Sequence, residues 1–150
     1  MSDQKRLHNF LYHAAIFDRL GLIAQNGLTT PRKHGFETDY DMPYYSQKFP
    51  DRLYLWETED AALNWAIDMG LVALRFPRKI IRTNQLVRDR AFPGFRRRFF
   101  PGWYVDATVL GTSLEACEEA EWNERLERVV AVSWIPLVTV KQPTHRTDLP

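Results

Sequence analysis

The stretch DRLYLWETEDAALNWAIDMGLVALRF, residues 51–76, contains a strand, a helix and a second strand in direct succession. Residues 51–56 have the apolar and aromatic composition of a strand. Thr58 predicts a helix N-terminus, since two acidic residues follow it in the first turn, and Gly70 predicts the end of the helix. Residues 71–76 are a strongly hydrophobic strand. The apolar face of the helix has the spacing i, i+3, i+4, i+7 and consists of Ala62, Trp65, Ala66 and Met69.

Other predicted elements flank this stretch on both sides. On the N-terminal side we expect a strand at 6–13, a helix at 16–25 that Gly27 ends, and a long loop at 30–50. On the C-terminal side we expect an irregular basic segment to 101, a strand at 103–110, a helix at 112–126 that opens with a Thr112/Glu115 capping box, and one or two strands at 129–140 interrupted at Pro136. Strands and helices are mixed without a regular alternation, which predicts the α+β class.

The composition fits one globular domain. The chain has 150 residues, a 45% hydrophobic share and many aromatics, with five Trp, six Tyr and nine Phe. We expect a single domain over residues 1–150, with 141–150 a frayed tail. Cys117 is the only cysteine, so an intrachain disulfide is impossible, which fits a reducing compartment. The first residues lead to no apolar stretch typical of a signal peptide or membrane span, so we expect a cytoplasmic protein without a membrane partner.

Charge is unevenly distributed along the chain although the formal net charge is only +1. Residues 75–98 carry nine basic side chains against the single acid Asp89, and residues 115–127 carry six glutamates against Arg125 alone. In the segment Arg88–Arg98, phenylalanines are interleaved with arginines, a pattern that suits phosphates and stacked bases. We therefore expect the acceptor substrate, nucleic acid or protein, to contact Arg96, Arg97 and Arg98; an ordinary basic loop anchored by phenylalanines is an equal reading.

Four short features, in order, resemble the ADP-ribosyltransferase core of diphtheria toxin and the poly(ADP-ribose) polymerases. They are Leu11-Tyr12-His13 closing the first strand, the helix from Ile16 that ends in Asn26-Gly27-Leu28, the strand Arg52-Leu53-Tyr54-Leu55, and the following helix Glu59 to Trp65. They cover about the first seventy residues, and their order carries the resemblance more than any one motif does. The resemblance implies a split β-sheet core with flanking helices.

The resemblance also implies a function: cleavage of the nicotinamide–ribose bond of NAD, used as co-substrate, with transfer of ADP-ribose to a macromolecular acceptor. In this reading His13 bonds a ribose hydroxyl, the backbone of Ala14 meets the nicotinamide amide, and Tyr54 and Trp65 stack on the nicotinamide ring. A carboxylate would hold the nicotinamide ribose, where positive charge develops in the transition state. Glu119, Glu121 and Glu124 are its candidates, and we take Glu121 as the catalytic one, with His13 and Tyr54.

Two positions depart from the family pattern. Ala15 stands where the family often has Ser or Thr, and Ala62 stands where the polymerases have a serine that bonds the carboxamide. Both departures weaken the expected grip on the nicotinamide amide.

Other functions stay open. His13 read alone is a core or edge histidine, and Trp65 lies on an apolar helix face, where packing suffices to explain it. The alternative function is a non-catalytic nucleic-acid- or nucleotide-binding module that uses the segment Arg88–Arg98. A third reading keeps the fold and transfers a 2′-phosphate from RNA to NAD, a reaction that needs further site arginines. A metal site is not expected, because His8, His13, His34 and His145 lack ligand spacing and one cysteine cannot build a zinc centre.

Overall fold

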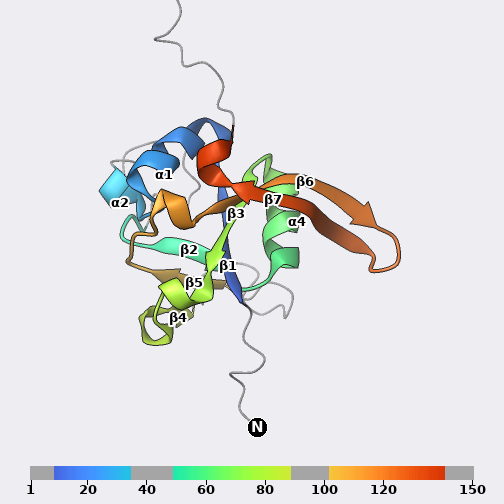
Figure 1. The fold of residues 1–150 in the computed structure, drawn as a ribbon. Coiled ribbons are helices and arrows are strands. Elements are labelled where there is room, and N and C mark those ends of the chain that lie inside the picture. Colours follow the sequence, from blue (N-terminus) through green and yellow to red (C-terminus); the bar gives the residue numbers. More distant parts are fainter. Residues whose placement is uncertain (1–8, 35–48, 89–101, 141–150) are drawn as a thin grey trace, which may run out of the picture.

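A computed structural model describes residues 9–34, 49–88 and 102–140. These residues form one seven-stranded antiparallel sheet in the order β4-β5-β2-β1-β3-β6-β7, with few helices, so the predicted α+β class is confirmed (Figure 1). The strands are β1 (Phe10–Ala15), β2 (Leu53–Trp56), β3 (Val72–Pro77), β4 (Val87–Arg88), β5 (Gly102–Val105), β6 (Glu115–Asn123) and β7 (Arg128–Pro136). The helices are α1 (Leu20–Asn26), α2 (Pro31–His34) and α4 (Glu59–Met69), with short 3-10 turns at Phe17–Arg19, Arg78–Ile80, Thr83–Gln85, Gly111–Ser113 and Leu137–Thr139.

The junction between β1 and β2 is the weakest pairing inside the sheet. β1 pairs with β3 along its whole length, from Phe10↔Pro77 to Ala15↔Val72. Toward β2 it pairs only at Tyr12↔Trp56. The two strands therefore separate beyond Tyr12 and leave space at the C-terminal end of β1.

Each face of the sheet buries its own hydrophobic cluster, because successive strand residues point to opposite faces. On one face, Leu74 packs with Leu20 and Ile23 of α1 in the larger cluster. On the other face, Ala73 packs with Leu63 and Ala66 of α4. The two helices thus cover opposite faces of the sheet.

Helix α4 begins and ends as its sequence predicts. The Thr58 side chain accepts a hydrogen bond from the backbone N–H of Ala61, at 3.2 Å. Gly70 follows the helix in the left-handed conformation with φ 67°, and the N–H of Leu71 bonds back to the carbonyl of Ala66 at 2.7 Å. The predicted apolar face is only partly right: Met69 is exposed, whereas the buried helix residues are Ala61, Ala62, Leu63 and Ala66.

Gly27 ends α1 at a place where only glycine fits. Its φ is +91°, and a Cβ there would lie 2.8 Å from the backbone oxygen of Val109. Next to it, Leu28 and Val109 exchange two backbone hydrogen bonds, at 2.7 and 2.8 Å. Gly27 does end α1 as predicted, but its ψ of 163° lies outside the left-handed helical conformation usual for a glycine that ends a helix, and the close approach joins the end of α1 to the segment that follows β5.

The predicted helix over 112–126 is wrong: residues Glu115–Asn123 form strand β6. β6 pairs with β7 along almost its whole length, and the hairpin extends beyond the rest of the sheet (Figure 1). Ala116 is buried against β3, and Glu115 forms an ion pair with Arg75, 2.9 Å between Nε and Oε1. Cross-strand packing against the Val-rich β7 outweighs the helix propensity of a glutamate-rich segment.

The remaining predictions are close to the observed elements. The first strand extends two residues past His13, and the helix from Ile16 opens with a 3-10 turn. The predicted loop at 30–50 contains the short helix α2, and the predicted strand at 103–110 is only Gly102–Val105. The strand predicted from 129 does end at Pro136. The predicted tail, 141–150, lies outside the described residues.

Candidate functional site

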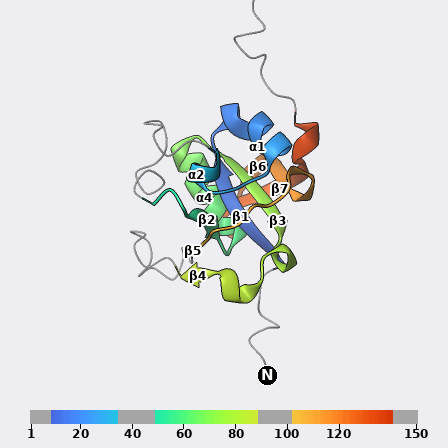
Figure 2. The ribbon, with the colours of Figure 1, turned by 90° about the vertical axis from the view of Figure 1, so that its left-hand side faces the viewer.

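A pocket opens where β1 and β2 separate. Strand residues supply its floor, from His13 and Ala14 on β1 to Leu53 and Tyr54 on β2. Its other lining residues are Ala15, Ile16, Arg19, Ile23, Leu28, Thr29, Pro31, His34, Arg52 and Leu71. The cavity measures about 80 Å³, which is room for several water molecules or one small group, so most of a dinucleotide would lie outside it. Figure 2 views the molecule from the side on which α2, β2 and β5 lie.

His13 is tied directly to the second strand. Its Nδ1 lies 2.8 Å from the backbone oxygen of Tyr54. A carbonyl oxygen can only accept, so Nδ1 carries the proton and donates it. In the neutral ring, Nε2 is then an acceptor with a lone pair. The side chain thus bridges the two strands where their ladder stops.

The His13 ring is neutral over a wider pH range than an ordinary histidine. Burial lowers the pKa of His13, and this outweighs the hydrogen bond to the Tyr54 carbonyl, which raises it; the nearby His34 lowers the pKa further. Near neutral pH the pocket therefore contains an imidazole whose Nε2 accepts a hydrogen bond rather than donating one.

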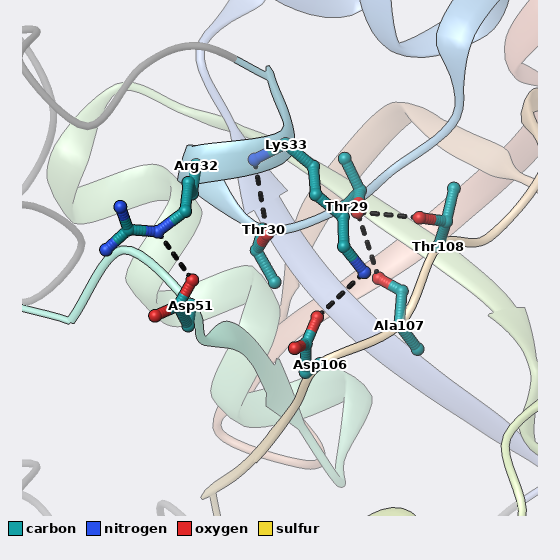
Figure 3. Close-up of polar contacts among 8 residues, drawn as sticks. All are labelled: Thr29, Thr30, Arg32, Lys33, Asp51, Asp106, Ala107 and Thr108. Atoms are coloured by element: carbon teal, nitrogen blue, oxygen red, sulfur yellow. Dashed lines mark hydrogen bonds and ion pairs between the residues drawn. The ribbon is translucent and has the colours of Figure 1, made fainter.

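Helix α2 forms one wall of the pocket, and its two middle residues form ion pairs with neighbouring segments (Figure 3). The Arg32 Nε lies 2.7 Å from Oδ1 of Asp51, just before β2. The Lys33 Nζ lies 2.8 Å from Oδ1 of Asp106, just after β5. These ion pairs are exposed, so each stabilises by only about 0.2–1 kcal/mol, and they connect α2 to the segments before β2 and after β5.

Thr29, two residues before α2, connects the same wall to the segment after β5. Its hydroxyl donates to the backbone oxygen of Ala107 at 3.2 Å and lies 2.7 Å from the hydroxyl of Thr108 (Figure 3). Thr29 is buried, as is Thr30, whose hydroxyl accepts a hydrogen bond from the backbone N–H of Lys33 at 3.4 Å. The wall is therefore attached both to the segment before β2 and to the segment after β5.

Basic side chains supply most of the polar lining. Arg19, His34 and Arg52 line the pocket, and the described residues contribute no acid to it. Burial lowers the pKa of His34, and the positive charge of Arg19 lowers it further. The guanidinium carbon of Arg52 lies over two rings, 3.9 Å from the centroid of Phe49 and 4.1 Å from that of Tyr104.

The structure brings together some of the residues singled out in the sequence and separates others. His13, Ala14 and Tyr54 line one pocket, as does Ala15, one of the two departures from the family pattern. Trp65 is not among the lining residues; it lies on α4, with its ring 5.8 Å from that of Trp56.

The predicted catalytic glutamate lies on the β6–β7 hairpin. Glu121 is exposed on β6, where it is the cross-strand partner of Val130, and it does not line the pocket. Glu119 and Glu124 are exposed as well. The structural reason is the strand that replaces the predicted helix, because β6 leaves the body of the sheet after Ala116.

Of the basic segment Arg88–Arg98, the structure describes only Arg88. Arg88 is the last residue of β4, and its guanidinium lies 5.2 Å from the ring centroid of Trp103 on the neighbouring β5. Arg96, Arg97 and Arg98 lie outside the described residues. The predicted contact with an acceptor therefore stays a prediction.

Arg19, His34 and Arg52 were missed as site residues in the sequence. His34 was considered only as a metal ligand, and Arg52 only as part of the strand motif with Tyr54. A usable signal was present for Arg52: it is two residues before Tyr54, so strand alternation puts both on the same face.

The described ranges 9–34, 49–88 and 102–140 contain no group of three or more His, Cys, Asp or Glu side chains able to hold a metal ion. No helix in these ranges has the length and apolar character needed to cross a membrane. Comparison with protein-family models, with curated proteins and with solved structures finds no significant match to this chain.

Proposed function

We propose that this chain binds NAD at the His13–Tyr54 pocket and transfers ADP-ribose to a macromolecular acceptor. The observation that carries the proposal is the meeting of His13, Ala14 and Tyr54 in one pocket, at the point where two neighbouring strands separate. The sequence resemblance implied that these three residues act together, and they come from strands about forty residues apart.

The sheet itself supports an ADP-ribosyltransferase-like core. The strands β4, β5 and β2 form one half and β1, β3, β6 and β7 the other, and the single pair Tyr12↔Trp56 joins them. A sheet that is nearly divided next to β1 is the arrangement expected of the split core. The His13–Tyr54 bond then takes the place of missing ladder bonds at the division.

The pocket residues suit the proposed chemistry. Nε2 of His13 accepts a hydrogen bond from a ribose hydroxyl, a role that needs the neutral ring which burial favours. The backbone of Ala14 meets the nicotinamide amide, and the Tyr54 ring stacks on nicotinamide. In the transfer, the bond between the ribose C1′ and the nicotinamide nitrogen breaks, nicotinamide leaves with the electron pair, and the acceptor nucleophile bonds to C1′ and loses its proton.

The transfer also needs a carboxylate that stabilises the positively charged sugar. The sequence resemblance implies Glu121, which is exposed on the hairpin. Asp106 does not line the pocket either, but it follows β5, the neighbour of β2, and its carboxylate bonds Lys33, which precedes the lining residue His34 on α2. We propose Asp106 for this role, with Glu121 as the alternative.

The test uses NAD labelled in the adenylate part, with cell extract as the source of acceptors. We expect nicotinamide release and labelled macromolecular product from the wild-type chain, and loss of both in His13→Ala. Tyr54→Phe keeps the ring that stacks on nicotinamide and should keep most of the activity. Wild-type protein that releases no nicotinamide and labels nothing over a panel of extracts contradicts the proposal.

A second candidate shares the fold and transfers a 2′-phosphate from RNA to NAD. Arg19 and Arg52 in the pocket favour it, because that reaction needs site arginines for the phosphate. The two candidates differ in the RNA they require: only the second removes a 2′-phosphate from a phosphorylated oligonucleotide. Product analysis with and without that oligonucleotide separates them.

A further inference from the structure

Arg52 is held in an unusual way at the border of the pocket. Its guanidinium lies over the ring of Phe49 and over the ring of Tyr104, with carbon-to-centroid distances of 3.9 and 4.1 Å. A planar guanidinium that packs on aromatic rings keeps its five N–H donors at its edge, in one plane. Because the rings fix the plane, little side-chain freedom remains to be lost when a ligand binds.

The donors of this guanidinium have no partner among the described residues. The neighbouring acids are already occupied: Asp51 bonds Arg32, and Asp106 bonds Lys33. An arginine placed only for stability would more commonly pair with one of these carboxylates. Arg52, a lining residue of the pocket, thus has N–H donors that no described residue accepts.

Arg19 adds a second positive charge to the pocket lining. Arg19 is close enough to His34, another lining residue, to lower the pKa of His34 electrostatically, so His34 contributes a neutral hydrogen-bonding ring rather than a charge near neutral pH. No acid from the described part of the chain lines the pocket. An anion is the ligand that such a lining favours, and a planar arginine fork fits the oxygens of a phosphate bidentately.

We propose that Arg52, supported by Arg19 and His34, forms a subsite for a phosphate group of a nucleotide ligand. The apolar lining of Ile16, Leu28 and Leu71 then contacts the uncharged part of the same ligand. The phosphate can belong to a pyrophosphate or to a monoester, since both present the same oxygens. The subsite does not depend on the transfer reaction, so it stands or falls separately from the proposed function.

The experiment compares pairs of ligands that differ by phosphate alone. Calorimetry with nicotinamide mononucleotide and nicotinamide riboside, and with ADP and adenosine, measures the preference for a phosphorylated ligand. We expect the wild-type chain to prefer the phosphorylated member by about tenfold to a hundredfold, as for hydrogen bonds to a charged group. Inorganic phosphate and pyrophosphate, used as competitors, tell which form of the group the subsite takes.

The matched variants are Arg52→Gln and Lys79→Gln. Each removes one positive charge, but Lys79 is exposed on the Arg78–Ile80 turn and does not line the pocket. We expect Arg52→Gln to abolish the preference and Lys79→Gln to keep it. Arg52→Lys, which keeps the charge and loses the fork, should give an intermediate value. Thermal unfolding of each variant identifies any loss of fold, and Arg19→Gln repeats the test without changing Arg52.

Any of three results would contradict the proposed subsite. They are equal binding of the two members of each pair, absence of binding of any of these compounds to the wild-type chain, and a preference that folded Arg52→Gln keeps. A phosphate preference in a chain that never cleaves NAD would refute the proposed function and leave the subsite standing. The reverse result, cleavage of NAD without dependence on Arg52, would do the opposite.

Discussion

Nδ1 of His13 donates a hydrogen bond to the backbone carbonyl of Tyr54 across 2.8 Å, at the place where β1 and β2 stop pairing. The bond connects the two halves of the sheet and at the same time fixes the tautomer of the ring. In the proposed site, structure and ligand binding depend on different nitrogens of one side chain: Nδ1 holds β2, and we propose Nε2 for the ligand.

Substitutions of His13 should separate these two effects. In His13→Asn the side-chain amide can occupy the position of Nδ1–H and keep the bond to Tyr54, while Nε2 is lost. We expect His13→Ala to lower the free energy of unfolding by about 1–3 kcal/mol, because the carbonyl loses its partner, and His13→Asn to lower it by less than about 1 kcal/mol. Both variants should lose NAD binding. Urea unfolding and calorimetry measure the two effects, and an Asn variant that still binds NAD would exclude Nε2 from the site.

Stability should fall in mildly acidic solution. Burial lowers the pKa of His13 and of His34 from the usual 6.5. Below about pH 6.5 the unfolded chain therefore binds protons that the folded chain does not, so the free energy of unfolding decreases as the pH falls. We expect a lower urea midpoint at pH 5.5 than at pH 7.5.

The control for this pH effect is the double variant His13→Asn/His34→Asn. It should show a smaller difference between the two pH values than the wild-type chain does. An unchanged difference would assign the effect to groups other than these two imidazoles.

The sequence was most informative between residues 51 and 76. Hydrophobic periodicity and capping residues are local signals. The strand, the helix that follows Thr58 and the strand after Gly70 were therefore all predictable. The meeting of His13 and Tyr54 was predictable only through a resemblance, since nothing in the spacing of two strands says that they are neighbours.

The misses have a common physical cause. Strand β6 depends on pairing with β7 and β3, which its local sequence does not reveal. Its glutamate-rich sequence therefore predicted a helix. The same holds for the basic side of the pocket. Arg19, His34 and Arg52 come from a 3-10 turn, a short helix and the residue before a strand, and only the tertiary structure brings them to one cavity.

The contact of Gly27 with Val109 predicts a large effect from a small substitution. In Gly27→Ala the new Cβ would lie 2.8 Å from the Val109 oxygen, with φ at +91° and ψ at 163°, a region that is almost exclusive to glycine. We expect a loss of about 1–3 kcal/mol from the backbone conformation alone, and more from the clash. The urea midpoint of the variant measures this loss.

Gly70→Ala is the control for Gly27→Ala. Its φ is also positive, but no atom lies within 4 Å of the added carbon, so its cost should be about 1–2 kcal/mol. Because Leu28 and Thr29 follow Gly27 and line the pocket, Gly27→Ala should also weaken ligand binding. Equal losses of stability in the two variants would contradict the close approach at Val109.

The catalytic carboxylate can be assigned by comparing two ion pairs of similar geometry. Asp106 and Asp51 each bond one basic residue of α2, at 2.8 and 2.7 Å, and their side chains are 60% and 64% exposed. Asp106→Asn and Asp51→Asn should therefore destabilise α2 equally. If Asp106 stabilises the charged sugar, Asp106→Asn should lower the rate of NAD cleavage by about a hundredfold or more, whereas Asp51→Asn should change it little.

Glu121→Gln completes the comparison. Its side chain is exposed on the hairpin, so we expect the free energy of unfolding to change by less than about 0.5 kcal/mol and the cleavage rate to stay near that of the wild-type chain. Should Glu121→Gln instead abolish cleavage while Asp106→Asn remains active, the sugar must bind where the β6–β7 hairpin can reach it. Since the described pocket has no wall from that hairpin, such a result would require a different bound arrangement of β6 or the hairpin of a second copy.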